Sequence, residues 1–308
     1  MKYPFKILFA GIGGVGGYFG GKLALYAAIN PTVEVSFLAR GEHLKAMQQN
    51  GLEIKERDQV FIAHPSNMSE DAAEFGIQDV VFLCCKSYDL DKMLEQIHPC
   101  IGPHTLLIPL LNGVQAREKI RLIYPKQFVC DACVYIVSQV IAPGKIHNSG
   151  NIECMFFGNV QSDPRMDVLL QVLLKAGIDA HLREDIETVV WEKFIFLSPT
   201  ANATTYFKQC LGNVLEVETS AKVIKGLLNE IIALALQKGI VLPESIYSIT
   251  LEKMKALPYS TTSSMQRDAE QNKKTEAEVL TQYVLQQAAK FNVEVPYYKS
   301  VWEGLNLG

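Results

Sequence analysis

The first half of the chain alternates short apolar runs with segments of helical periodicity. The apolar runs suited to strands cover residues 5–10, 33–38, 80–84 and 105–110. The last two are almost wholly apolar, as expected for strands that are buried on both faces of a parallel sheet. A helical pattern follows the first run and extends through residues 23–26. This alternation predicts an α/β domain in which helices cover a parallel-rich sheet.

The second half of the chain has a different pattern. From about Asp185 onward helical periodicity dominates and no strand signal remains. The clearest helical segments are residues 186–196, 222–237 and 276–290. We therefore predict an α/β domain at residues 1–184 and an all-helical domain at residues 185–308. The length of 308 residues agrees with two domains, because one hydrophobic core rarely serves so long a chain.

Composition and charge narrow the classes of function. Apolar residues make up 48% and charged residues 20% of the chain, as in ordinary globular proteins, which excludes wholesale disorder. Lysine and arginine number 29 against 33 aspartate and glutamate residues, a net charge of −4, and there is no basic stripe. Nucleic acid is therefore not an expected partner. No apolar run approaches the roughly 18 residues of a membrane-spanning helix, so we expect no membrane insertion.

The first residues and the cysteines favour a cytoplasmic setting. Residues 1–6 carry positive charge, but the apolar stretch behind them ends in glycines rather than in a signal-peptide cleavage site, so we interpret it as a first strand. The seven scattered cysteines are odd in number and do not form a complete disulfide framework. They are typical of a protein in a reducing, cytoplasmic environment.

Cys130 and Cys133 form a C-x-x-C spacing, the one pattern here that suggests redox or metal chemistry. They lie in a run of strand-forming residues, 128–137, and side chains three apart on a strand point to opposite faces. No second C-x-x-C or H-x-x-x-H pattern completes a set of four ligands. We therefore predict buried structural thiols, as for Cys84 and Cys85, and no metal site.

A glycine-rich turn lies between the first predicted strand and the first predicted helix. It matches G-x-G-x-x-G in Gly11, Ile12, Gly13, Gly14, Val15 and Gly16. The first glycine permits a tight turn, the second a close approach of the backbone to a pyrophosphate, and the third close packing of helix on strand. Phosphates then lie against free N–H groups at the positive end of the helix dipole. We predict a Rossmann-type, dinucleotide-binding domain; the alternative is a tight turn with only a structural role.

The end of the second strand indicates which dinucleotide binds. A carboxylate there would hold a ribose 2′-hydroxyl, but this strand is followed by Ala39, Arg40 and Gly41. A guanidinium at this position is suited to a 2′-phosphate, and no acid stands directly beside it to repel that group. The sequence therefore predicts NADPH rather than NADH, unless Arg40 is an ordinary surface arginine.

Several separated segments together resemble the ketopantoate reductase (2-dehydropantoate 2-reductase) family. The resemblance includes the glycine-rich turn and Arg40, and it extends from residue 6 to about residue 305. The other matching segments are Cys85–Ser87, Leu111–Val114, Pro143–His147, Trp191–Phe194, Ser263–Asp268, Thr275–Glu276 and Val293–Pro296. Their common order and spacing are more specific than any one of them alone.

The resemblance implies an NADPH-dependent reduction of 2-dehydropantoate to (R)-pantoate, in the pathway to pantothenate and coenzyme A. By analogy with the family, Lys193 contacts the substrate and protonates the ketone oxygen while nicotinamide delivers hydride, and Glu276 orients that lysine. Ser264 would help to hold the substrate carboxylate. Lys86 and Asn112 are expected where the nicotinamide meets the substrate, with Asn112 contacting both.

This chemistry agrees with general principles, although each residue has a simpler interpretation. Hydride addition leaves negative charge on oxygen, and a positioned ammonium both stabilises that charge and supplies the proton. Lys86 and Asn112 follow strands, and ligands of open α/β sheets bind outside the carboxyl ends of strands. Without the resemblance, Lys193 is compatible with a solvated helix lysine. Glu276 is compatible with an acid at a helix start, and Ser264 with a helix cap.

Members of the family usually have three asparagines that contact the substrate and its hydroxyl group, two of them one and two helical turns after the lysine. This sequence has Leu197, Ala201 and Leu211 at about those positions instead. On a helix, Leu197 and Ala201 share the face of Lys193, which is then apolar beyond the lysine. An apolar pocket favours a 2-oxo acid with a branched hydrocarbon tail over one with a terminal hydroxyl.

Two alternatives to the main prediction follow. One is an NADPH-dependent reductase of another small 2-oxo or 3-oxo acid, which the missing asparagines favour. Ser198, Thr200, Asn202 and Thr204 are polar but turned away from the line of Lys193 and Leu197, and a kink at Pro199 would allow one of them to compensate. The other is a non-catalytic dinucleotide-binding sensor, against which the presence of both Lys193 and Glu276 argues. A homodimer is compatible with a helical second domain, but the sequence identifies no dimer face.

Overall fold

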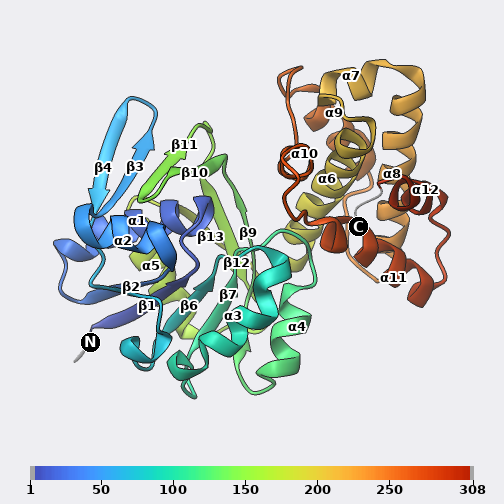
Figure 1. Cartoon of the computed structure of the whole chain (residues 1–308). Coiled ribbons are helices and arrows are strands. Elements are labelled where there is room, and N and C mark those ends of the chain that lie inside the picture. The colour runs from blue at the N-terminus through green and yellow to red at the C-terminus, as the bar shows by residue number, and fades with distance from the viewer. Residues whose placement is uncertain (1–3, 306–308) are drawn as a thin grey trace. The chain divides into compact units, whose positions relative to one another are not determined.

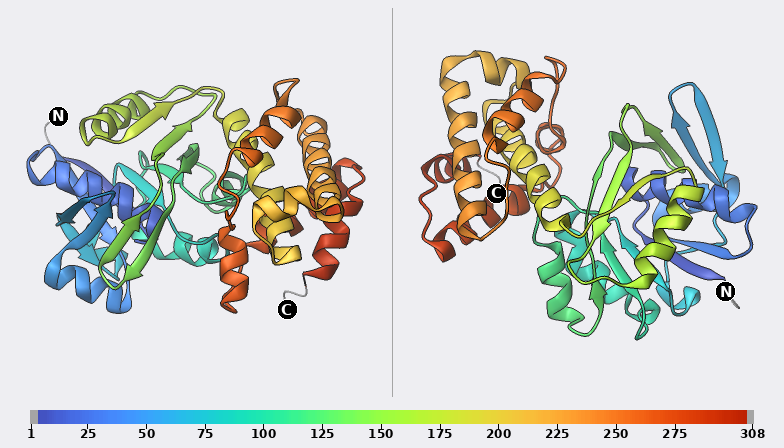
Figure 2. Two further views of the ribbon diagram at one scale, coloured as in Figure 1. Left: turned by 90° about the horizontal axis from the view of Figure 1, so that it is seen from above. Right: turned by 180° about the vertical axis from the view of Figure 1, so that it is seen from behind.

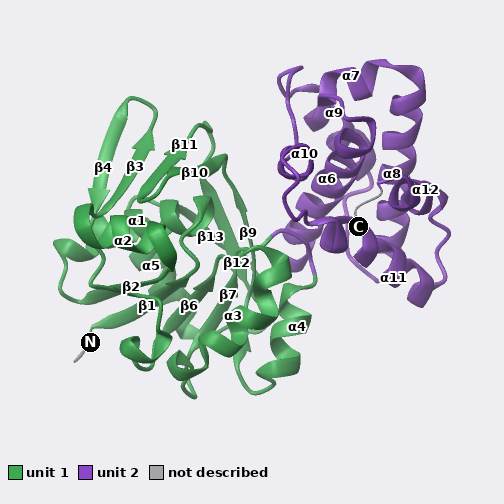
Figure 3. Ribbon diagram, in the orientation of Figure 1, with its two compact units in different colours: residues 1–111, 115–186 green, residues 112–114, 187–308 purple. Residues whose placement is uncertain are grey.

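The computed structural model describes residues 4–305. The chain forms two compact units, each of which is described by itself (Figure 3). Unit 1 contains residues 1–111 and 115–186, and unit 2 contains residues 112–114 and 187–308. The inclusion of residues 112–114 in unit 2 has no counterpart in the sequence pattern. No helix within residues 4–305 is long and apolar enough to cross a membrane.

A six-stranded parallel sheet forms the centre of unit 1 (Figure 1). The strand order is β5-β2-β1-β6-β7-β8, and every neighbouring pair is parallel. This is the 3-2-1-4-5-6 order of a Rossmann sheet when its strands are renumbered along the chain. The strands are β1 (Phe5–Ala10), β2 (Val33–Leu38), β5 (Asn67–Ser69), β6 (Val80–Leu83), β7 (Leu106–Pro109) and β8 (Phe128–Val129). The predicted Rossmann-type fold with a parallel-rich sheet is therefore confirmed.

Helices cover both faces of this sheet (Figure 2). They are α1 (Gly14–Ala28), α2 (Gly41–Asn50), α3 (Leu90–Gln96), α4 (Ala116–Ile123) and α5 (Pro164–Lys175), with short 3-10 helices η1 (Ala72–Phe75), η2 (Ser87–Asp89) and η3 (His98–Cys100). Side chains alternate along a strand, so β1 contributes to two cores. Phe9 packs in the core that includes Phe19 of α1, whereas Leu8 packs in the core that includes Leu94 of α3.

A four-stranded sheet with the order β10-β11-β3-β4 packs along α1. Its strands are β3 (Leu52–Glu56), β4 (Gln59–Ala63), β10 (Ser138–Ala142) and β11 (Lys145–Asn148). Glycines of α1 permit this contact. A Cβ atom at Gly17 would lie 2.8 Å from Ile146, and one at Gly21 would lie 2.1 Å from Ile54. The sheet therefore approaches the helix that follows the glycine-rich turn too closely for larger side chains.

A three-stranded sheet with the order β13-β12-β9 completes unit 1. Its strands are β9 (Asp131–Tyr135), β12 (Cys154–Gly158) and β13 (Asp179–Leu182). The run 128–137, predicted as one strand, is divided between β8 and β9, with Cys130 at the break. Cys130 and Cys133 are both buried, and Sγ of Cys130 lies 3.6 Å from Sδ of Met166. Within residues 4–305 no three potential ligands from histidine, cysteine or acidic residues group as a metal site would require.

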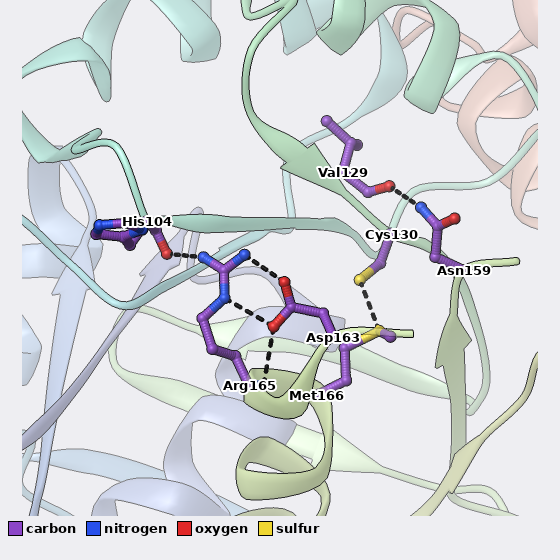
Figure 4. A network of polar contacts seen from close by, with 7 residues as sticks. All are labelled: His104, Val129, Cys130, Asn159, Asp163, Arg165 and Met166. Atoms are coloured by element: carbon purple, nitrogen blue, oxygen red, sulfur yellow. Dashed lines mark hydrogen bonds and ion pairs between the residues drawn. The ribbon is translucent and has the colours of Figure 1, made fainter. Parts of the chain in front are cut away.

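A polar cluster holds the amino-terminal end of α5 (Figure 4). Asp163 caps this helix by accepting the main-chain N–H of Arg165 (2.9 Å). Its carboxylate also accepts from Nε of Arg165 (2.8 Å), and this pairing lowers the pKa of Asp163 below its ordinary value. The same guanidinium donates to the main-chain oxygen of His104, just before β7. The cluster thus joins α5 to the amino end of a central strand.

Unit 2 is helical throughout the part that the structure describes. Its elements are α6 (Ile186–Phe207), α7 (Leu211–Glu216), α8 (Glu218–Gln237), α9 (Ile246–Lys255), α10 (Ser264–Glu270), the π-helical turn η4 (Glu278–Gln282), α11 (Tyr283–Phe291) and α12 (Pro296–Gly304). Apolar side chains from these helices form one core. The helix predicted at residues 276–290 is continuous from residue 277 to residue 291, but its turn η4 is π-helical and leads directly into α11. π-helical turns are uncommon in proteins, but a large share of those that exist lie at functional sites.

Candidate active site

The glycine-rich turn connects β1 to α1. Gly11 directly follows β1 and has a φ angle of 101°, in the left-handed region that favours glycine. Its N–H donates to the main-chain oxygen of Leu38, the last residue of β2 (3.1 Å). A Cβ atom at Gly11 would also lie 3.1 Å from the main chain of Cys84. The turn itself therefore requires the first glycine of the motif.

The other glycines of the motif differ in their surroundings. A Cβ atom at Gly16 would lie 2.1 Å from the main-chain oxygen of Gly11, so helix and strand are packed too closely for a side chain. One at Gly14 would lie 2.2 Å from the main-chain oxygen of Ser138 in β10. At Gly13, in contrast, nothing lies within 4 Å of such an atom. Gly13 therefore borders open space, as the approach of a pyrophosphate requires.

The amino-terminal end of α1 is suited to an anion. Gly13 is its N-cap residue, no side chain caps the helix, and the first turn contains no acidic residue. The first main-chain N–H groups of a helix have no partner within the helix, and they lie at the positive end of its dipole. Ile12 and Val15 pack into the core, so the turn presents its backbone. These residues fit the pyrophosphate of a dinucleotide.

Two cations lie at the same edge of the sheet as this turn. Arg40 follows β2 and Lys86 follows β6, the two strands that flank β1. Carboxyl ends of parallel strands meet at one edge, where ligands of open α/β sheets bind. Arg40 is exposed, and its guanidinium makes no hydrogen bond or ion pair with any residue between 4 and 305. The nearby acid Glu42 pairs with Lys45 instead (2.8 Å).

His43, in the first turn of α2, supports this edge and was not predicted from the sequence. Its Nδ1 accepts the main-chain N–H of Gly144, in the turn between β10 and β11 (3.0 Å). Burial lowers the pKa of His43, which keeps the ring neutral and able to accept this bond. A histidine that is isolated in the sequence gives no signal of such a contact, because its partner is a main-chain group about 100 residues away.

Three of the predicted site residues come together within unit 2. Nζ of Lys193 donates to Oδ1 of Asn112 (3.3 Å). Nδ2 of Asn112 donates to Oε2 of Glu276 (3.2 Å). The amide of Asn112 thus bridges an ammonium group and a carboxylate, presenting its acceptor to the first and its donor to the second. The sequence predicts that Asn112 contacts the cofactor and the substrate, but it does not predict this bridge.

The main chain around the bridge is tightly constrained. Gly113 has a φ angle of 91°, and a Cβ atom there would lie 2.2 Å from Cγ1 of Val279. The main-chain oxygen of Glu276 accepts the N–H groups of Val279 and Leu280, both at 3.0 Å. The glycine therefore lets the residue before it, Asn112, approach the segment that carries Glu276.

This arrangement is suited to proton transfer. Glu276 is only 3% exposed, whereas Lys193 is partly buried. The oxygens of a buried carboxyl group need hydrogen-bond donors, and Nδ2 of Asn112 is one of them. An ammonium group held through such a bridge can give a proton to an oxygen on which negative charge develops. The bridging amide fixes the direction in which that ammonium group points.

Ser264 is not joined to this chain of hydrogen bonds. It is the partly exposed first residue of α10, and within residues 4–305 it makes no hydrogen bond to Lys193, Asn112 or Glu276. The helix cap is its neighbour Ser263, whose Oγ accepts the main-chain N–H of Gln266 (3.0 Å). The cap interpretation therefore applies to Ser263, and contact of Ser264 with substrate stays a prediction.

The face of α6 beyond Lys193 is apolar. Leu197 and Ala201 follow Lys193 at four-residue spacing, Ala201 is 1% exposed, and Leu211 is buried in α7. The polar side chains nearby already donate to acceptors within unit 2. They are Ser198, Thr200, Asn202, Thr204 and Thr205. Pro199 lies inside α6, and the donors around it stay engaged.

Comparisons with family models cover most of both units. A model described as "Ketopantoate reductase PanE/ApbA" matches residues 7–162. A second, described as "Ketopantoate reductase PanE/ApbA C terminal", matches residues 185–307. The first match contains the glycine-rich turn and Asn112, and the second contains Lys193 and Glu276.

Known proteins resemble the chain over its whole length. The crystal structure of 2-dehydropantoate 2-reductase from Porphyromonas gingivalis W83 has a TM-score of 0.88 and 33% identity, covering 98% of this chain and 99% of that chain. An uncharacterized oxidoreductase of Bacillus subtilis (strain 168), YkpB, is 27% identical over 98% of each chain. A D-mandelate dehydrogenase structure with NADH and anilino(oxo)acetate shares the fold, with a TM-score of 0.83 and 20% identity over 98% of this chain and 97% of that chain. From the two family matches and the 33% identity it follows that the chain belongs to the ketopantoate reductase family.

Proposed function

We propose that the protein reduces 2-dehydropantoate to (R)-pantoate with NADPH, as a step toward pantothenate and coenzyme A. The observation that carries this proposal is the hydrogen-bonded chain of Lys193, Asn112 and Glu276 in a member of this family. Reduction of a ketone to an alcohol needs a proton for the new hydroxyl group, and an oriented ammonium group can supply it. A dinucleotide-binding sensor has no need of such a group.

Each residue of the chain has a separate task in this proposal. Bound NADPH supplies the hydride that adds to the ketone carbon. Lys193 holds a proton at Nζ and passes it to the ketone oxygen as negative charge develops there. Asn112 orients the ammonium group of Lys193. The carboxylate of Glu276 favours the charged form of this lysine until the proton is transferred. Ser264 offers its hydroxyl group to the carboxylate of the substrate.

The preference for NADPH rests on Arg40. Its exposed guanidinium, at the end of β2, has the charge and geometry to pair with a 2′-phosphate. The Gly11–Gly16 turn would hold the pyrophosphate, and Lys86 would lie toward the nicotinamide. The fold alone does not select the cofactor, because the D-mandelate dehydrogenase structure of this fold contains NADH.

A second candidate is a reductase of another 2-oxo acid whose side chain is a hydrocarbon. The observation that favours it is the apolar face of α6 at Leu197 and Ala201, together with the engaged donors around it. A substrate hydroxyl group placed against hydrocarbon loses its hydrogen bonds to water without replacement. A branched apolar tail would gain from burial there.

A panel of 2-oxo and 3-oxo acids with NADPH and with NADH tests both candidates. Turnover is followed by the loss of the absorbance band of the reduced nicotinamide. We expect 2-dehydropantoate and NADPH to give the highest kcat/KM, with (R)-pantoate as the product on chiral chromatography. A strong preference for 2-oxoisovalerate would establish the second candidate instead. The absence of turnover with every acid would overturn both.

A further inference from the structure

A fully buried polar network joins α6 to the π-helical turn η4. Ser198, Asn202, Thr281 and Tyr298 are each 0% exposed. The main-chain oxygen of Leu280 accepts two hydrogen bonds from α6, one from Oγ of Ser198 (2.6 Å) and one from Nδ2 of Asn202 (3.0 Å). Oγ1 of Thr281 donates to Oδ1 of Asn202 (2.5 Å). Two adjacent residues of η4 are therefore held by side chains of one helix.

The protons of this network can be assigned. Ser198 gives its one hydroxyl proton to Leu280, so in its 2.6 Å contact with Tyr298 the phenol is the donor. Burial raises the pKa of Tyr298, which keeps that phenol protonated. Nδ2 of Asn202 also donates to the main-chain oxygen of Ser198 (2.9 Å). A buried network with its donors satisfied favours one arrangement over others, because any slip leaves a polar group without a partner.

Leu280 connects this network to the predicted site. Its carbonyl group is held by α6, and its N–H donates to the main-chain oxygen of Glu276 (3.0 Å). The adjacent Val279 donates to the same oxygen and lies against Gly113, the neighbour of Asn112. The network therefore holds the main chain of Glu276. It also holds Val279, which packs against Gly113, the residue next to Asn112.

The same helix carries the lysine of the site. Lys193 lies on α6 five residues before Ser198, so α6 presents the ammonium group and also holds the turn that carries the carboxylate. A π-helical turn differs from an α-helical one by one residue per hydrogen-bonded ring. If the turn relaxed to α-helical spacing, the residues before it would rotate about the helix axis. Glu276 would then leave Asn112.

We propose that Asn202 and Thr281 are positioning residues, which hold η4 in the π-helical form that places Glu276 against Asn112. The inference rests on the proposed function, since it assigns these residues a part in orienting the general acid Lys193. The competing interpretation is a network that only stabilises the helical core. The two interpretations differ in what a variant does to the pH dependence of the reaction.

Thr281→Val removes the hydroxyl group and keeps the shape of the side chain. We expect kcat to fall about tenfold. This is less than the loss of about 10²-fold that a displacement of roughly 1 Å in a catalytic group can cause. The KM for NADPH should not change. The alkaline limb of the pH profile of kcat should move to lower pH, because displacement of Glu276 removes a carboxylate that favours the charged lysine.

Thr205→Val is the matched control. Thr205 is also buried on α6, and its hydroxyl group donates to the main-chain oxygen of Ala201 in the same helix (2.7 Å). We expect this variant to keep the kcat and the pH profile of the parent. If Thr281→Val behaves like Thr205→Val, the positioning role is wrong. Should Thr281→Val fail to fold, Asn202→Ala, which removes both the bond to Leu280 and the bond to Thr281, is measured in the same way, and an unchanged kcat and pH profile would again contradict the proposal.

A readout that is independent of activity separates this inference from the proposed function. Crystal structures of the parent and of Thr281→Val would show whether the contact between Glu276 and Asn112 is lost. If it persists in the variant, the positioning role is overturned, whatever the enzyme reduces. If the parent turns over no oxo acid but the variant loses the contact, the proposed function fails and the positioning of Glu276 stands.

Discussion

Nζ of Lys193 donates a hydrogen bond to Oδ1 of Asn112, a residue 81 positions earlier in the chain (3.3 Å). An amide carries no charge, and its oxygen accepts from an ammonium group and from a neutral amine alike. The lysine side chain therefore keeps its direction before and after it loses a proton. In the role proposed for Lys193, this contact would return the side chain to the same position after each proton transfer.

Lys193→Ala should lower kcat by about 10²- to 10⁴-fold, the usual contribution of a general acid. NADPH binding should be retained, because the glycine-rich turn is unaffected. Steady-state kinetics and fluorescence titration of NADPH check the two expectations. Lys253→Ala, at an exposed position of α9, is the control and should match the parent. A kcat of Lys193→Ala within a factor of three of the parent would exclude the assignment.

Arg40→Ala should reduce kcat/KM with NADPH by about 10- to 100-fold, since a hydrogen-bonded ion pair to a phosphate is lost. The value with NADH should change little, because NADH has no 2′-phosphate. The ratio of the two values is the quantity to measure. Arg121→Ala, an exposed arginine of α4, should leave the ratio unchanged. Equal ratios in the parent and in Arg40→Ala would show that the arginine does not select the cofactor.

Substitution by alanine should have different effects on stability and cofactor binding at Gly13 and at Gly16, two glycines of the same motif. At Gly13 a methyl group enters open space, so the melting temperature should change little while the KM for NADPH rises severalfold. At Gly16 the methyl group would lie 2.1 Å from the main-chain oxygen of Gly11, so the fold itself should be destabilised. Thermal unfolding and cofactor titration of both variants separate the effects. Equal losses of stability would contradict the distinction.

The fold could be predicted closely where burial dictates the pattern. β1 and β2 have the bounds expected from their apolar runs, because both are enclosed on two faces. The sequence predicts one strand over residues 128–137, whereas the chain leaves the main sheet at Cys130 and enters another. The residues on both sides of this break favour strands equally, and only the packing of two sheets decides where one strand ends.

The site could be predicted in its residue types better than in its geometry. Motif spacing gave the glycine-rich turn, and the family resemblance gave Lys193 and Glu276. The bridge through Asn112 joins segments 81 and 164 residues apart, which only the folded chain brings together. The π-helical turn was missed as well, because helical periodicity does not reveal an insertion that depends on partners such as Asn202 in another helix.

Asp163→Asn should lower the free energy of unfolding by about 1 kcal/mol at neutral pH, because asparagine keeps the helix cap but loses the ion pair with Arg165. The pKa of Asp163 is lowered in the folded protein, so its ion pair contributes fully above the ordinary value of 3.8. That contribution is lost as the pH falls further, through the folded pKa.

Urea unfolding at several pH values checks this expectation. The difference between the parent and Asp163→Asn should be constant near neutrality and should disappear in acid, well below pH 3.8. Asp185→Asn is the control, because Asp185 pairs with Arg183 at a more exposed position and should have a smaller effect. A difference that persists unchanged in acid would mean that the carboxylate charge is not its cause.

Leu197→Asn should shift substrate preference toward 2-oxo acids with a hydroxyl-bearing tail. Leu197 follows Lys193 by four residues on α6, so an amide there would face the same direction as the lysine. One hydrogen bond to a substrate hydroxyl group is worth about 1 kcal/mol, or roughly a fivefold change in kcat/KM. The ratio of kcat/KM for 2-dehydropantoate to that for 2-oxoisovalerate should therefore rise about fivefold. Leu236→Asn, at an exposed position of α8, should leave this ratio unchanged, and an equal ratio in Leu197→Asn would place the substrate tail elsewhere.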